Sequence, residues 1–120
     1  APPMDPLFDE IFDVVRAQPA TLNEVQGVGS PTRVAAVQRA VAALGAIIGE
    51  TAAHELGHSF GLAQPHGSKT AFHSASPGEG CLMDGGFDRP LVERAAQPGA
   101  SSSALCGDEV EYLLEVLPAP

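Results

Sequence analysis

Apolar residues recur every three or four positions in several stretches of the chain, the spacing that places them on one face of an α-helix. The first stretch follows Asp5-Pro6, a favourable N-cap and first helical residue, and this helix should end before Pro19. The second follows Ser30-Pro31 and is expected to run to Gly61, as one long helix or two nearly continuous ones. The apolar positions of these two patterns are Leu7, Phe8, Ile11, Phe12 and Val15, then Val34, Val37, Val41, Leu44 and Ile48.

The remaining stretches are mostly irregular. Residues 18–30 and 63–107 contain many Gly and Pro breakers, and a short helix is expected over 90–96. A last helix is expected from Asp108, as its N-cap, to Pro118, with its apolar side packed on the back of the second helix. There is no internal repeat and no convincing β-strand. The pattern therefore predicts a mostly α chain.

Composition limits the classes of partner. At 120 residues the chain, residues 1–120, fits one domain with a modest core. Its net charge of −9 and lack of a basic cluster argue against nucleic acid. Arg39 and Glu50 bracket the longest apolar run, so we expect no membrane span. The chain lacks an initiator Met and a signal peptide, and we interpret it as a mature product or an excerpt of a longer precursor.

The candidate chemistry lies at His54-Glu55-Leu56-Gly57-His58. Two histidines four residues apart share one face of a helix and can bind a single Zn²⁺, while Glu55 can hold and deprotonate a zinc-bound water. The alternative is an amphipathic helix with two surface histidines, and the helical context favours the zinc site. The residues expected to form a buried surface behind the site are Ala52, Ala53, Leu56 and Phe60.

The motif and its flanks carry a family resemblance. His54-Glu55-Leu56-Gly57-His58-Ser59-Phe60-Gly61-Leu62, followed by Cys81-Leu82-Met83-Asp84, resembles the metzincin metallopeptidases, matrixin-like members especially. The resemblance implies that Met83 forms a methionine turn packed under the imidazoles. It also implies that the chain is the active-site helix plus C-terminal subdomain of an α+β zincin domain, whose N-terminal sheet is missing or reduced.

The third zinc ligand departs from the family pattern. The position of the usual third histidine is occupied by Gln64, whose neutral amide oxygen is a poor zinc ligand. Phe72-His73 ahead of Leu82-Met83-Asp84 is similar to a bacterial secreted branch of the family, so we favour His73, with His66 as the alternative. A glutamate ligand, Glu79 or Glu93, fits the methionine turn less well.

The function implied by the resemblance is a secreted bacterial zinc endopeptidase acting on polypeptide substrates, with a pro-segment or further domains in a longer precursor. Its alternative is a non-catalytic zinc-binding or structural module, or a degenerate peptidase fragment, which the presence of Gln64 and the missing sheet favour. Cys81 and Cys106 could form one disulfide, in keeping with secretion, and two buried free thiols are the other possibility.

Overall fold

The structure is a computed structural model, and it describes residues 5–62, 80–85 and 88–118. Within these residues the elements are α1 (Pro6–Ala17), α2 (Leu22–Val25), α3 (Pro31–Ser59), α4 (Leu91–Arg94) and α5 (Gly107–Val116). The described part has no β-strand, only an isolated parallel bridge between Cys81 and Ala104. The prediction of a mostly α chain is confirmed.

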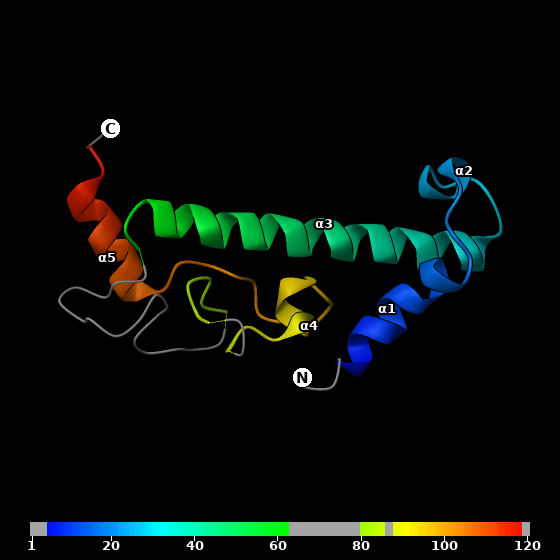
Figure 1. Ribbon diagram of the computed structural model, residues 1–120, viewed down its shortest axis with the longest axis horizontal. Helices are drawn as coiled ribbons and strands as arrows, with labels where there is room; N and C mark the ends of the chain where they lie inside the picture. The colour runs from blue at the N-terminus through cyan, green and yellow to red at the C-terminus, as the bar shows by residue number, and fades with distance from the viewer. Residues whose placement is uncertain (1–4, 63–79, 86–87, 119–120) are drawn as a thin grey trace.

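Helix α3 is the long axis of the molecule, with α1 and α2 near its first turns, α4 beside its middle and α5 near its last turn (Figure 1). It is continuous over 29 residues, so of the two arrangements expected, one long helix or two nearly continuous ones, the first is observed. The helix stops at Ser59, and Gly61 adopts a φ of +85°, a conformation that residues with a Cβ rarely adopt. That turn sends the chain away from the end of α3.

The first core lies between α1 and the N-terminal half of α3. Helix α1 begins as predicted, because the Asp5 side chain accepts a hydrogen bond of 2.9 Å from the backbone N–H of Leu7. Ile11 and Phe12 are buried on its inner face, and the residues they pack with are Ala40, Ala43 and Ala95. Large side chains on one helix therefore meet small ones on the other, which lets the two helices approach closely.

The predicted core face of α3 is wrong over most of its length. Val37 is fully buried, but Val41, Leu44 and Ile48 are 46%, 50% and 59% exposed. The buried stripe runs instead through the alanines at positions 40 and 43. Alanine occurs on both buried and exposed faces of helices, so the pattern predicted that the larger apolar residues would be buried. In the structure the large side chains of α1 leave room only for alanines at the contact.

A short helix also interrupts the predicted loop at 18–30. Thr21 and Glu24 form a capping box: Thr21 Oγ1 accepts from the Glu24 N–H, and Glu24 reaches back to the Thr21 N–H. The Thr-x-x-Glu pattern is a helix-start signal, and the prediction of a loop, which was based on the glycines of this stretch, did not take it into account. Glu24 also pairs with Arg33 at 3.1 Å, which joins α2 to the start of α3.

The bounds of α4 agree with the prediction, and those of α5 agree only at its C-terminal end. Helix α4 lies within the expected 90–96. Helix α5 ends before Pro118 as expected, but it begins at Gly107 with Cys106 as the N-cap residue, so Asp108 is not its cap. Of the residues expected on its packing side, Leu113 does pack, together with Tyr112, but against Leu62 and Met83 rather than the back of α3. The other three, Val110, Leu114 and Leu117, are 41%, 78% and 45% exposed.

Helix α3 is long and apolar enough to cross a membrane, judged by length and composition alone. Core helices of soluble proteins pass the same test, so this is weak evidence. The absence of a membrane span stays a prediction.

Candidate metal centre

The predicted metal-binding group lies on the last two turns of α3. One ligand atom from each of His54, Glu55 and His58 falls within 4.8 Å of the others, which is close enough for one metal ion to contact all three. His54 is only 2% exposed, His58 is partly buried and Glu55 is exposed. The group is therefore anchored in the protein on one side and open to solvent on the other.

Both imidazoles are oriented by backbone carbonyl groups. His54 Nδ1 lies 2.6 Å from the Leu82 oxygen, and His58 Nδ1 lies 3.2 Å from the Leu62 oxygen. Because a carbonyl oxygen only accepts hydrogen bonds, these contacts assign the ring proton of each histidine to Nδ1. In the neutral rings Nε2 then carries a lone pair, which is the state that binds a metal.

The two Nε2 atoms are 3.0 Å apart, and the rings meet edge to face at 90°. In a tetrahedral zinc site, two nitrogens each about 2.0–2.1 Å from the ion lie about 3.3 Å from one another. With both protons on Nδ1, two lone pairs share a space that a cation would fill favourably. The donor set, its spacing and its tautomers thus fit a zinc ion.

Burial also favours the neutral form of His54. Desolvation lowers the pKa of this imidazole below its ordinary value, and it outweighs the opposing effect of the hydrogen bond to Leu82. The nearby positive charge of Arg89 acts in the same direction as burial. The His54 ring therefore stays neutral, with one ring proton, over a wider pH range than the imidazole of a free histidine.

Met83 forms the buried support of α3 at this site. It is fully buried, and a Cβ added to Gly57 would lie 2.5 Å from its Sδ atom, so the sulfur reaches the helix between the two histidines. The prediction of a buried surface behind the site is wrong for all four of its residues: Ala52 and Ala53 are exposed, and Leu56 and Phe60 are 57% and 47% exposed. Support comes instead from residues distant in sequence, which helical periodicity does not predict.

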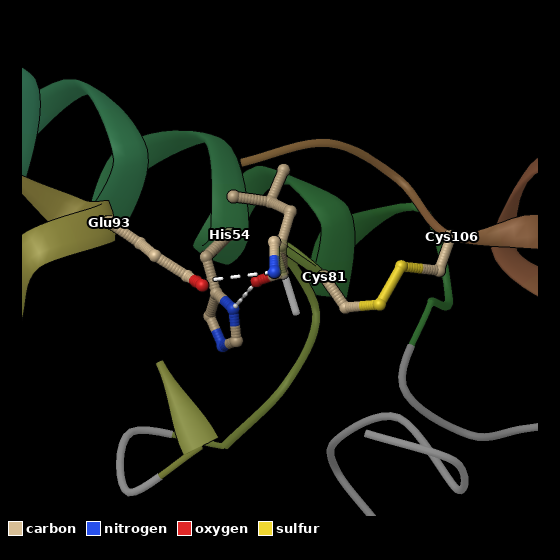
Figure 2. The surroundings of a disulfide bond; sticks show 6 residues. His54, Cys81, Glu93 and Cys106 are labelled. Carbon is tan, nitrogen blue, oxygen red and sulfur yellow. Dashed lines mark hydrogen bonds between the residues drawn. A yellow bond between two sulfur atoms is a disulfide. The ribbon is translucent and has the colours of Figure 1, made fainter. Parts of the chain in front are cut away.

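The turn that carries Met83 is held from several directions. Cys81 and Cys106 form a disulfide to the start of α5, the pairing that the sequence left open (Figure 2). The backbone of Leu82 donates to the Ala104 oxygen at 2.7 Å, and the N–H of Gly80 donates to Glu93 Oε2 at 3.2 Å. The turn is therefore connected to both α4 and α5.

A buried ion cluster, which the sequence analysis missed, lies one helical turn before His54. Glu50, whose side chain is 6% exposed, accepts hydrogen bonds from Arg89 and, at 3.2 Å, from Arg94. Arg94 also donates to Thr51 Oγ1 at 2.9 Å. The signal available in the sequence is Glu50 itself, a charged residue inside the apolar pattern of α3.

Of the candidate third ligands, only Glu93 belongs to the described part of the chain. His66 and His73 lie outside the described residues, as do Gln64 and Glu79. Glu93 is described, and its carboxylate is engaged with the backbone of Gly80.

A cavity of about 290 Å³ lies beside the ion cluster, between α3, α4 and residues 100–103. It is lined by Glu50 and Glu93 but by none of the three residues of the metal-binding group, so it does not locate a substrate subsite.

Comparisons with protein-family models, with curated proteins and with solved structures found no match to this chain.

Proposed function

We propose that the chain is a zinc-dependent endopeptidase of metzincin type, or the catalytic part of one. In this proposal His54 and His58 bind zinc, and a histidine after the turn at Gly61, His73 in preference to His66, completes the ligand set. Glu55 is the general base. The proposal includes a polypeptide substrate and a secreted bacterial setting, which rest on the motif resemblance.

One observation carries the proposal: two histidines with Nδ1 protons directed to carbonyl oxygens and Nε2 atoms 3.0 Å apart, beside an exposed glutamate. A structural zinc site usually uses all four positions for protein ligands and has no need of a carboxylate open to water. Here Glu55 is exposed while His54 is buried. That division favours catalysis over the alternative of a structural zinc module.

The chemistry divides between the metal and the protein. When bound, zinc supplies Lewis acidity, which lowers the pKa of water and polarises a carbonyl group. Glu55 takes the proton from the attacking water and passes it to the departing amine as the peptide bond breaks. His54 and His58 keep their orientation because their Nδ1–H groups remain bonded to Leu82 and Leu62.

Glu55→Gln tests the role of the general base without removing either of the proposed zinc ligands His54 and His58. The variant should bind zinc about as tightly as the wild type while its hydrolysis of a mixed peptide library, followed by mass spectrometry, falls at least about 100-fold, as expected on losing a general base. Glu115→Gln, on the exposed side of α5, is the matched control and should keep full activity.

Two outcomes contradict the proposal. Hydrolysis by Glu55→Gln at the wild-type rate would refute Glu55 as the base. A wild-type chain that binds one zinc ion but cleaves none of the library would support the non-catalytic zinc module instead.

A further inference from the structure

The turn from Gly80 to Asp84 connects the metal-binding group to the rest of the described chain. Its Leu82 carbonyl accepts the Nδ1–H of His54 at 2.6 Å, and Met83 packs against Gly57 on the same helix. The turn itself has little regular structure: the Asp84 N–H donates to the Cys81 oxygen, and a single bridge joins Cys81 to Ala104. Its position therefore depends on what holds it from outside.

Besides its backbone hydrogen bonds with Ala104, this turn is held by two groups from later in the chain, one on α4 and one at the start of α5. Glu93, on α4, accepts the N–H of Gly80, the first residue of the turn, at 3.2 Å. The Cys81–Cys106 disulfide joins the first residue after Gly80 to the N-cap of α5. Figure 2 shows the Glu93 carboxylate, the disulfide and the His54 ring gathered around this one turn.

The two attachments share one consequence for His54. If the turn moves, the Leu82 oxygen moves with it, and the buried Nδ1–H of His54 loses the acceptor that fixes its tautomer and ring angle. Partners of this kind behind a metal ligand typically contribute 10–100-fold in metal affinity. Neither attachment touches the Nε2 atom that would face the ion.

We propose that Glu93 and the Cys81–Cys106 disulfide are positioning groups for the candidate metal centre: they hold the 80–84 turn so that its Leu82 carbonyl keeps the His54 ring in its orientation, with Nε2 turned toward Nε2 of His58. The inference rests on the proposed metal site and adds the residues that set its affinity. It assigns Glu93 to orientation of a ligand rather than to ligation.

The test compares two glutamates with the same kind of contact. Glu93→Ala removes the acceptor for Gly80, and Glu93→Gln keeps an oxygen there. Glu24→Ala is the matched control, because Glu24 is also a partly buried glutamate that accepts from a backbone N–H, and it lies on α2, near the other end of α3. A fourth variant, Cys81→Ser with Cys106→Ser, removes the disulfide without adding thiolates that would bind zinc themselves.

Zinc affinity, measured by competition with a chromophoric chelator, should fall about 10-fold or more in Glu93→Ala and in the double serine variant. It should stay within about threefold of wild type in Glu93→Gln and Glu24→Ala. In the metal-free protein, ¹⁵N NMR of the imidazoles should show the Nδ1–H form of His54 in the wild type, and a mixture with the Nε2–H form in Glu93→Ala.

The inference is overturned if Glu93→Ala changes neither the affinity nor the tautomer, or if Glu24→Ala weakens zinc binding equally. If the double serine variant does not fold, Glu93→Ala still decides. A wild-type protein that binds no zinc would refute the proposed function, and the tautomer measurement on metal-free protein would still test the positioning role.

Discussion

Gly57→Ala should destabilise the protein, whereas the same substitution at Gly49 on the same helix should stabilise it. A Cβ at Gly57 would lie 2.5 Å from Met83 Sδ, 3.1 Å from Met83 Cε and 3.5 Å from a Leu62 methyl carbon. A Cβ at Gly49 would meet nothing within 4 Å. The two substitutions therefore share their effect on the helix and differ only in packing.

The difference in packing sets the expected difference in the free energy of unfolding between the two variants. Replacing a helical glycine by alanine stabilises a helix by up to about 1 kcal/mol. Forcing an extra carbon into a filled core costs about 1–3 kcal/mol, and Met83 is fully buried, so it cannot swing into solvent without exposing apolar surface. The free energies of unfolding of the two variants should then differ by about 1–3 kcal/mol, with Gly57→Ala the lower.

Urea unfolding of both variants and the wild type measures this directly. Gly57→Ala should also bind zinc more weakly, because displacing Met83 displaces its neighbour Leu82, the acceptor for His54. Gly49→Ala should leave zinc affinity unchanged. If the two variants are equally stable, Met83 does not pack between the histidines as described, and the support of the metal centre has been assigned to the wrong residue.

Two further predictions concern the stability of the same region. Glu50→Ala should lower the free energy of unfolding by about 3–5 kcal/mol, because it leaves two largely buried arginines without their carboxylate. Arg16→Ala, which removes only exposed ion pairs on α1, should have a much smaller effect, and similar losses of the two variants in urea unfolding would contradict this reasoning. Replacing Cys81 and Cys106 by serine should cost about 3 kcal/mol, since the disulfide closes a segment with a sequence separation of 25 in the unfolded chain; an unchanged urea midpoint would mean that the bond does not form in solution.

The parts of the structure that the sequence predicted are those that depend on local spacing. The limits of α1 follow from Asp5-Pro6 and Pro19, and the facing of His54 toward His58 follows from their separation by four residues. Both results need no knowledge of the rest of the chain. The contact of Met83 with Gly57 is different, because it joins positions 26 residues apart. Only the family resemblance pointed to Met83, and it implied packing under the imidazoles rather than this contact.

The wrong predictions of which helix faces are buried have a common physical cause. A hydrophobic pattern says that a face is apolar but not what will cover it, and on α3 two apolar faces compete. Ala40 and Ala43 are buried because α1 presents Ile11 and Phe12 to them, while Leu44 remains 50% exposed. Choosing between such faces requires the sizes of the side chains on both helices, which no single window of sequence contains.

Helix α3 connects two cores that have different tasks. Its N-terminal half packs against α1 through small residues, and its end packs on Met83 and Leu62 through the turn at 80–84. Between them lies Glu50, whose buried carboxylate binds arginines that follow that turn. This cluster therefore joins residues 89–94 to the middle of α3. The two candidate metal ligands, His54 and His58, lie one and two turns further on, and the turn whose Leu82 carbonyl orients His54 is followed by residues that are themselves anchored on α3.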